Sequence, residues 1–590
     1  MSQKFSSDKF HIPIVFGVTG HRHIEPDISE NLYLSICNFL RVFQTEYPDS
    51  PFILISALAE GADRIVARAA IDVGINLYVS LPMPVEEYEQ DFSSQESLDE
   101  FTSLRSKSIG TYINNCTDPA DERDHCYYQS GKWMLKRCDV LIALWDGIYT
   151  DLTGGTGEVV RMALSEFETD NNDYLNGKIQ VYHFYTPRKD QEKINNISAG
   201  DLWVYNNFED FDGSLEKGKK ISHVDLPGFV ITQHLSKTNT FNQYSETACG
   251  NKYHLLPENY RLNSSSQLRY LDDLFTSSDR IALGFQKIFN KHSMIFYLAS
   301  SFAMISLILF LRLVPSTIMI TLYVLFFVVT SAVAYRMKRN LYQDNYILYR
   351  TLSEMTRIKF FIYLLEKDDE NGFAGNNPKM INQYIHRKMM GNGFWVLKSI
   401  KKSSLFKNSD STISKGETYE LIKKYWVKNQ YHYFINAHRK SNSKHRKYKL
   451  IQNTLFITSI ILSIVISFLM YFSADENGLI VKLAAISIGI AGGLGGVIKT
   501  YTYTMAFSET TKQYSIMEEL YKNYDAKISD KNYGKSDLRS LSWEALMENI
   551  EWYSLRYNRP VKRAKTKHWI KNTKHWIKNT LRNLKGFFSH

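Results

Sequence analysis

The sequence predicts two structural classes in one chain: an N-terminal α/β domain built on a parallel sheet, and an all-α membrane domain with four transmembrane helices in two hairpins. Strand-like and helical patterns alternate through the first 190 residues, as they do in parallel sheets covered by helices. Four later stretches approach the ~20 apolar residues that a helix needs to cross a bilayer. Charge divides the chain similarly: residues 1–250 contain 21 basic and 37 acidic side chains, a net charge of −16, and the remainder has +26.

The N-terminal sheet is predicted to contain five strands, with a helix between each strand and the next: 12–16, 52–56, 76–81, 140–144 and 179–185. In such sheets, ligands bind outside the carboxyl ends of the strands. The residues that directly follow the strands are therefore the candidate site.

Three of these turns combine glycines with polar side chains. Glycine lets the backbone approach a ligand closely, and Arg22 offers a fork of donors to a phosphate or carboxylate. The glycine run before Glu158 opens a helix and suits a phosphate cradle, while Glu158 suits a ribose hydroxyl or the helix dipole. The candidate ligand-binding residues are Gly17, Thr19, Gly20, His21, Arg22, Ser56, Ala57, Glu60, Gly61, Asp63, Trp145, Asp146, Gly154, Gly155, Thr156, Gly157 and Glu158.

Four motifs resemble those of the SLOG superfamily over roughly residues 10–190: Thr19-Gly20-His21-Arg22, Ala59-Glu60-Gly61-Ala62-Asp63, Leu81-Pro82-Met83-Pro84 and Gly154-Gly155-Thr156-Gly157-Glu158. That superfamily contains the Rossmann-like domains of LOG phosphoribohydrolases, the DNA-processing protein DprA, and sensors of nucleotide-derived signals in prokaryotic immunity. The resemblance implies a Rossmann-like fold and a nucleotide pocket lined by the candidate residues.

The chain departs from the hydrolytic members of that superfamily. Those carry a proline before the paired glycines and an Arg-Lys pair upstream, whereas here Thr153 precedes Gly154 and the upstream region reads Arg123-Asp124-His125-Cys126. A glycosidic-bond hydrolase also needs a partner that orients the leaving group, and the sequence offers Glu158 no evident one. We therefore expect a sensor without catalytic residues, and the alternative is a membrane-tethered nucleotide or NAD glycosidase that uses Glu158.

The four apolar spans are expected at 294–311, 316–335, 454–472 and 478–498, with a short turn inside each pair. Between the pairs, residues 336–450 contain 24 basic and nine acidic side chains. Basic residues favour the cytoplasmic side of a membrane. The sequence therefore predicts a multi-pass membrane protein with both termini in the cytoplasm, and the resemblance implies that the membrane is the bacterial inner membrane.

The last span contains two overlapping GxxxG spacings, Gly489 with Gly493 and Gly492 with Gly496, which let another helix approach its backbone. They fit self-association into a homo-oligomer and packing within the hairpin equally well. Lys482 is the only charge in this span, and its place in the first turn predicts that it reaches the outer interface. A pore-lining role for Lys482 is the less favoured alternative.

The sequence further divides into segments of different character. Residues 268–290 have helical spacing and predict a helix leading into the first span. In architecture, the flanks of the spans resemble SLATT proteins, two-helix membrane effectors linked to SLOG and cyclic-nucleotide systems. The expected domains are a sensing domain at 1–190, an irregular closing segment at 191–262, a helix and hairpin at 263–350, a basic helical segment at 351–450, a second hairpin at 451–500, C-terminal helices at 501–560 and an amphipathic tail at 561–590.

The tail accounts for the whole net charge of +10, because ten basic residues and no acid occur from Arg559 onward, against 61 of each before it. A tandem repeat, 566–572 and 573–579, places tryptophan and isoleucine on one helical face. This pattern is typical of a helix that lies in a membrane interface. Beside apolar spans, a polybasic segment favours an anionic lipid bilayer over nucleic acid as its partner.

Five cysteines, an odd number without a CxxC pair, predict reduced and buried thiols in a cytosolic N-terminal half. Cysteines and histidines lack metal-ligand spacing, so we expect no metal and no cofactor besides a nucleotide-derived ligand. The resemblance implies an effector of antiphage defence by abortive infection, in which a messenger made by a partner enzyme triggers membrane permeabilisation. A constitutive channel or transporter with a regulatory domain is a further alternative.

Overall fold

The computed structural model describes the chain in two compact units. The first comprises Met1–Arg280 and Met355–Thr418, and the second comprises Ile281–Glu354 and Tyr419–His590. The described residues are 9–559 except for 115–122, 149–151, 165–178, 188–197, 206–218, 223–224, 231, 249, 251, 314, 367–383, 386, 390, 407–412, 473–477 and 530–533.

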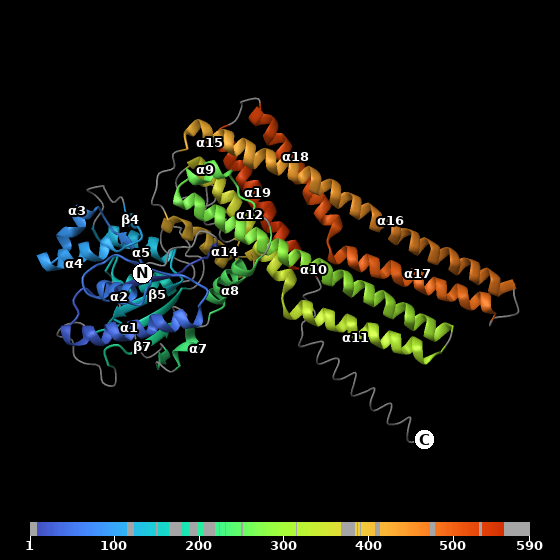
Figure 1. Ribbon diagram of the computed structural model, residues 1–590, viewed down its shortest axis with the longest axis horizontal. Helices are drawn as coiled ribbons and strands as arrows, with labels where there is room; N and C mark the ends of the chain where they lie inside the picture. The colour runs from blue at the N-terminus through green and yellow to red at the C-terminus, as the bar shows by residue number, and fades with distance from the viewer. Residues whose placement is uncertain are drawn as a thin grey trace, which may run out of the picture. The chain divides into compact units, whose positions relative to one another are not determined.

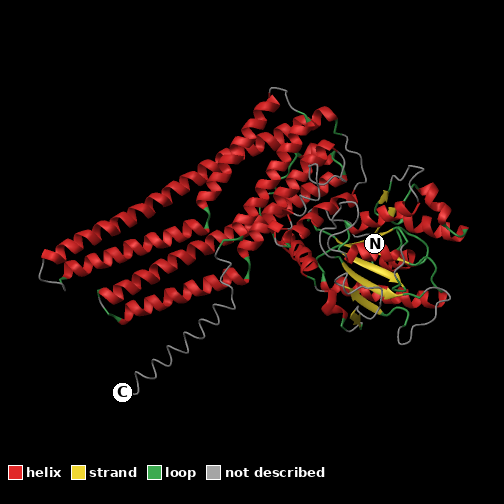
Figure 2. Cartoon of the chain, turned by 180° about the vertical axis from the view of Figure 1, so that it is seen from behind, coloured by secondary structure: helices red, strands yellow, loops and turns green. Residues whose placement is uncertain are grey.

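The first unit contains a mixed sheet of eight strands in the order β4-β3-β2-β1-β5-β6-β7-β8. Strands β1 to β6 run parallel, and β7 and β8 continue the sheet antiparallel. Figure 2 shows the strands in yellow within the N-terminal part of the chain. The predicted α/β class is confirmed. The strands are β1 (Ile14–Gly20), β2 (Phe52–Ser56), β3 (Asn76–Leu81), β4 (Thr111–Ile113), β5 (Val140–Trp145), β6 (Gln180–Tyr185), β7 (Leu202–Tyr205) and β8 (Lys219–Ile221).

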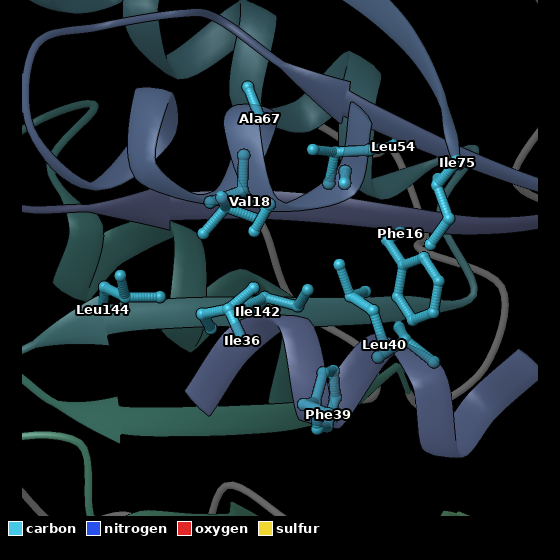
Figure 3. Close-up of a cluster of buried hydrophobic side chains, with 14 of the residues drawn as sticks. Phe16, Val18, Ile36, Phe39, Leu40, Leu54, Ala67, Ile75, Ile142 and Leu144 are labelled. Atoms are coloured by element: carbon cyan, nitrogen blue, oxygen red, sulfur yellow. The ribbon is translucent and has the colours of Figure 1, made fainter. Parts of the chain in front are cut away.

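Helices cover both faces of this sheet because alternate strand residues point to opposite sides. In β1, Ile14, Phe16 and Val18 join one hydrophobic cluster, whereas Val15 joins the other. The first cluster is shown in Figure 3, where strand side chains meet those of α1 and α2. The helices of this region are α1 (Pro26–Glu46), α2 (Ala62–Asp72), α3 (Val85–Tyr88), η1 (Glu89–Asp91) and α4 (Gln95–Ser106) on that side, and α5 (Arg123–Leu135) and α6 (Thr156–Leu164) on the other.

Two expectations about this unit are wrong in detail. Strand β1 was expected at 12–16 but extends to Gly20, because its glycines pair with β5 as Gly17↔Leu141 and Gly20↔Leu144. The segment 191–262, expected to be irregular, contains β7, β8 and three helices, α7 (Leu226–Val230), α8 (Gln233–Thr247) and α9 (Glu258–Leu262). Its polar composition concealed these elements: α8 buries Asn242, whose side chain donates to the Ile12 carbonyl and accepts from the Ile12 N–H.

A distant part of the sequence completes the first unit. Helix α14 (Asn392–Lys401) and the short helix η4 (Lys402–Phe406) lie between the second and third apolar helices in the sequence. The Lys402 ammonium donates to the Asp139 carboxylate (2.6 Å) and to the Pro13 carbonyl (2.7 Å). Lys398 donates to the Cys138 carbonyl. Both lysines are buried, so this segment is docked at the amino ends of β1 and β5.

The remaining elements are helical. Four of the described helices are long and apolar enough to cross a membrane: α10, α11, α16 and α17. The expected helix before the first span is confirmed, since α10 continues without a break from that segment through the span. These helices are visible in Figure 1: α10 (Ser266–Arg312), α11 (Thr317–Arg339), α12 (Tyr342–Glu366), α15 (Lys415–Leu421), the π-helix η5 (Ile422–Lys428), α16 (Asn429–Phe472), α17 (Leu479–Thr504), α18 (Phe507–Ser529) and α19 (Lys535–Tyr557).

Helix α17 packs against two other apolar helices through its glycines. A Cβ atom on Gly493 would lie 2.2 Å from Met304 of α10, and one on Gly489 would lie 3.5 Å from Ile308. Gly492 instead faces Ser459 of α16, whose hydroxyl donates to the Ile488 carbonyl (3.3 Å). The first GxxxG spacing therefore serves contact with α10 inside the same chain, whereas Gly496 has nothing within 4 Å among the described residues.

Cys37 and Cys138 are free buried thiols, as expected, but Cys126 is disulfide-bonded, which corrects the expectation that the cysteines are reduced thiols. The cysteine spacing carries no pairing signal, because no CxxC motif is present. The tail with its tandem repeat lies outside the described residues, as do Cys116, Cys249 and the turn that contains Asp475 and Glu476.

Candidate functional site

The carboxyl ends of β1 and β5 meet where the strand order reverses, which is where ligands bind in sheets of this kind. His21 follows β1, and its backbone N–H donates to the Leu144 carbonyl (2.9 Å). Its ring Nε2 lies 3.0 Å from the backbone nitrogen of Asp146, whose N–H it accepts. The Asp146 carboxylate is buried and accepts the Ile148 N–H (3.0 Å). These contacts therefore hold His21 and Asp146, two predicted site residues, in place relative to each other.

The turn after β2 is organised by the buried carboxylate of Asp63. It accepts the Ser56 hydroxyl (3.2 Å) and the Ala57 N–H (3.1 Å), and the Ser56 hydroxyl oxygen in turn accepts the Leu58 N–H (3.0 Å). Burial raises the pKa of Asp63 to about 6, although the hydrogen bonds from Ser56 and Ala57 oppose this shift. Asp63 and Ser56 thus shape the turn, and both are almost fully buried.

The first two predicted turns are in direct backbone contact. Gly61 has φ +77°, and a Cβ atom there would lie 2.2 Å from the Arg22 carbonyl oxygen. A Cβ atom on Gly20 would lie 2.4 Å from the Cβ atom of Ala62. The backbone N–H of Ala62 donates to the His21 carbonyl (3.0 Å). Only glycine fits at either position without displacing backbone, so these two glycines allow the turns to pack together.

A cavity of about 410 Å³ opens beside these turns. It is formed by the residues after β1, the first turns of α1 and α2, and one side of α4. Cationic and acidic side chains both line it, and the amino ends of α1 and α2 add partial positive charge. The lining residues are Arg22, His23, Ile24, Glu25, Pro26, Ser29, Glu60, Gly61, Arg64, Ile65, Arg68, Ser93, Ser97 and Glu100.

Two of the three acidic residues that line the cavity, Glu60 and Glu100, are already engaged. Glu60 accepts the Ser93 N–H (2.9 Å) and hydroxyl (2.8 Å), together with the Ser97 hydroxyl. Burial disfavours its charge, but these hydrogen bonds outweigh burial and lower the pKa of Glu60. Glu100 accepts from Arg64 and Arg68, each at 3.1 Å. These carboxylates therefore act mainly to position the arginines and α4.

The arginines differ in what they can offer a ligand. Arg64 is buried, donates to the Leu58 carbonyl (3.1 Å) and lies over the Phe92 ring, so it is a structural cation. Arg68 is about half exposed. Arg22, 41% exposed, donates to the Tyr127 hydroxyl (2.7 Å) and lies 3.5 Å from Asp91. Arg22 and Arg68 are therefore the side chains free enough to receive an anion.

The third predicted turn is near this region but outside the cavity. Gly154 has φ +75°, and a Cβ atom there would lie 2.8 Å from Tyr127 Cβ, the residue whose hydroxyl Arg22 contacts. The Glu158 carboxylate accepts the Gly154 N–H (2.6 Å) and lies 3.5 Å from Arg161. Glu158 thus caps its own helix, and Thr156 and Gly157 begin that helix directly after Gly155.

Two predicted residues are placed in the packed core. A Cβ atom on Gly17 would lie 2.9 Å from Met134 and 3.2 Å from Cys138, so this glycine lets α5 approach β1. The Trp145 side chain is buried in the cluster under α5 and α6. Ala57, Thr19 and Thr156 lie at the carboxyl edge, partly buried.

Arg68, Tyr127, Ser93 and Ser97 were not among the predicted site residues. A signal for Arg68 was available, because Arg64 and Arg68 are one helical turn apart directly after the Gly61 turn. The contribution of α4 depends on tertiary packing that no local pattern reveals.

Among the described residues, one group could hold a cation on geometric grounds: His254, Asp272 and Asp273. Arg261 occupies this position. Its guanidinium lies 3.0 Å from Asp272 and 2.5 Å from Asp273, and His254 lies 2.7 Å from Asp272. The arginine therefore supplies the charge that a metal would bring, and we assign the group to the structural core of α10.

No protein-family model matches the chain, and a search of curated proteins finds no significant relative.

Proposed function

We propose that the chain is a ligand-gated membrane effector of bacterial antiphage defence. Its α/β unit binds a nucleotide-derived second messenger made by a partner enzyme. The four apolar helices span the inner membrane, with both termini cytoplasmic, and permeabilise or disrupt it once the messenger binds. The ligand drives this change only as far as it binds the active state more tightly.

One observation carries the proposal: a single chain combines an arginine-lined cavity of about 410 Å³ at the carboxyl edge of a parallel sheet with four helices of membrane-spanning length. The guanidinium fork suits phosphate oxygens, and Arg22 and Arg68 are the accessible donors. The nucleotide class and the antiviral setting are supported by the motifs that resemble SLOG and SLATT proteins.

The sensor proposal is favoured over the glycosidase alternative by the state of Glu158. Its carboxylate is bound to the Gly154 N–H at 2.6 Å and pairs with Arg161. A carboxylate that acts in glycoside hydrolysis must face the reacting sugar carbon. The site must also hold the leaving group and the acid that protonates it. Capping its own helix leaves Glu158 poorly suited to that task.

The proposal is tested with the full chain in lipid nanodiscs. Binding of NAD, nucleoside monophosphates and cyclic oligonucleotides is measured by calorimetry, and base release is followed in the same samples. We expect binding without turnover, and a loss of affinity of about tenfold or more for Arg22→Ala or Arg68→Ala, because each charge-assisted contact contributes about 1.5–3 kcal/mol. Arg41→Ala, an exposed arginine of α1 outside the cavity, is the matched control and should bind like wild type.

In cells, the same variants are compared during phage challenge while membrane potential is followed. Wild type and Arg41→Ala should depolarise the cells, and Arg22→Ala should not. Catalytic base release would establish the glycosidase instead. Ion flux from proteoliposomes without any nucleotide would identify a constitutive channel.

A further inference from the structure

Helix α16 carries an unusually one-sided charge. Residues 421–474 contain no acidic side chain and nine basic ones. Six of these are exposed residues of the cytosolic half of α16, here named the basic face: Arg439, Lys440, Lys444, Arg446, Lys447 and Lys449. Within the described part of the chain, no acidic side chain pairs with any of the six.

The basic face lies on the side of α16 that is not packed against protein. Three residues of this helix contact α18: His438 pairs with Glu518 (2.6 Å), Ser441 hydrogen-bonds Thr511 (2.8 Å), and Tyr448 stacks on Phe507 (5.6 Å). At 100° per residue these three occupy about 80° of the helix circumference, and the six basic residues fall within the remaining arc. The charges therefore point outward.

The basic face ends where the apolar surface begins. Lys449 is followed directly by Leu450 and Ile451, which are exposed, and from there to Tyr471 the exposed side chains of α16 are uncharged and mostly apolar. An aromatic cluster marks the same level, because Tyr448 contacts Tyr501 of α17, and Tyr501 contacts Tyr297 of α10. Aromatic side chains gather at the boundary between lipid tails and headgroups.

This level places half of the basic face among lipid headgroups. At 1.5 Å per residue, Arg446, Lys447 and Lys449 lie within ~6 Å of Leu450 along the helix axis, which is the depth of the headgroup region. Arg439, Lys440 and Lys444 lie ~9–17 Å from it, in the aqueous layer next to the membrane. In a membrane at this level, the inner three would reach phosphates directly, whereas the outer three would act through the surface potential.

We propose that the basic face of α16 is a binding surface for the headgroups of anionic phospholipids. This inference rests on the membrane location in the proposed function, but not on nucleotide sensing. Because 54 residues contain no acid, no carboxylate of the same segment competes with the headgroups. Each basic residue near an anionic membrane contributes about 1 kcal/mol of attraction.

The test compares two variants of equal charge in the full chain in detergent. The inner variant is Arg446→Gln, Lys447→Gln and Lys449→Gln, and the outer one is Arg439→Gln, Lys440→Gln and Lys444→Gln. Phosphatidylglycerol and phosphatidylcholine are titrated at 150 mM salt, and bound lipid is counted by native mass spectrometry. Wild type should prefer phosphatidylglycerol, the inner variant should lose on the order of 10- to 100-fold in its affinity, and the outer variant should lose less than the inner one.

Several results would overturn the inference. They are equal binding of the two lipids by wild type, equal losses in the two variants, displacement of the lipid by millimolar inorganic phosphate, and tighter binding of single-stranded DNA than of lipid by the same face. Unchanged thermal unfolding in phosphatidylcholine shows that both variants fold. Nucleotide binding is measured on the same samples, so that failure of the sensor proposal is separated from failure of lipid recognition.

Discussion

The Asp139 carboxylate accepts a 2.6 Å hydrogen bond from the Lys402 ammonium, although 263 positions separate the two residues and both are almost completely buried. The same carboxylate accepts the Val15 N–H (2.9 Å) and lies 2.8 Å from His234 Nε2. Burial alone would raise the pKa of Asp139, but Lys402 and His234 outweigh it and hold that pKa well below its usual range. This ion pair joins the segment between the apolar helices to the amino ends of β1 and β5.

Replacement of Lys402 by methionine is expected to release α14 and η4 from the sheet. Removing one partner of a buried pair leaves the other charge uncompensated, which costs about 3–5 kcal/mol. The buried thiol of Cys138 is a local reporter, because the carbonyl of this residue accepts from Lys398. Alkylation of Cys138, followed by mass spectrometry, should accelerate on the order of 100-fold.

Cys37, a free buried thiol of α1, is the internal control for this measurement. Its alkylation should accelerate much less than that of Cys138. Equal acceleration of the two thiols would mean that the whole unit opens, and it would contradict local docking of α14.

Protonation of Asp63 is expected to make the stability of the α/β unit depend on pH. Its pKa in the folded chain is about 6, above the ~3.9 of a free aspartate. The folded state therefore holds the proton more tightly, so the contribution of Asp63 is complete below pH ~4 and is lost as pH rises to about 6, by roughly 3 kcal/mol.

Asp63→Asn removes this dependence, because an amide oxygen can still accept from Ser56 and Ala57. Thermal unfolding of wild type and variant should agree at pH 4, and the variant should be the more stable protein at pH 7. The comparison fails if the difference between the two proteins stays constant across this range.

The sequence predicted the parallel strands and the apolar helices because long hydrophobic runs identify both. Strands β2 and β3 have the predicted bounds, since each is a buried run that ends at a turn. The short strands β4, β7 and β8 were missed, because three or four residues carry too little periodicity. The docking of α14 could not be foreseen, since Lys402 in a basic segment is indistinguishable in sequence from a solvated lysine.

Gly61→Ala should destabilise the unit far more than Gly74→Ala, although both glycines have positive φ, +77° and +81°. Either alanine suffers the strain of a positive φ, at least about 1–2 kcal/mol. At Gly61 the new methyl group would also lie 2.2 Å from the Arg22 carbonyl oxygen, whereas it meets nothing within 4 Å at Gly74. Chemical denaturation should give an additional loss of at least ~1–3 kcal/mol for Gly61→Ala, and similar losses for the two variants would show that the turns do not pack closely.

The candidate site was predictable only in part, for a related reason. Glycine-rich turns after strands located the carboxyl edge, and Arg22, Glu60 and Gly61 do line the cavity. The pattern could not show that Asp63 and Glu158 accept hydrogen bonds from their own turns, since a carboxylate that organises a loop has the same sequence signature as one that binds a ligand. Arg68 and the residues of α4 come to line the cavity through packing between separate elements.

The glycines of α17 separate packing within the chain from self-association. Gly493→Leu should weaken contact with α10, because a side chain there meets Met304, and overpacking of this kind costs about 1–3 kcal/mol. A Cβ atom on Gly496 would meet nothing within 4 Å in the described part of the chain, so Gly496→Leu should leave thermal unfolding in detergent unchanged. If Gly496 mediates self-association, its variant should instead lower the oligomer fraction measured by light scattering. An unchanged oligomer fraction together with unchanged stability would exclude Gly496 from both roles, and assembly would then have to use another surface.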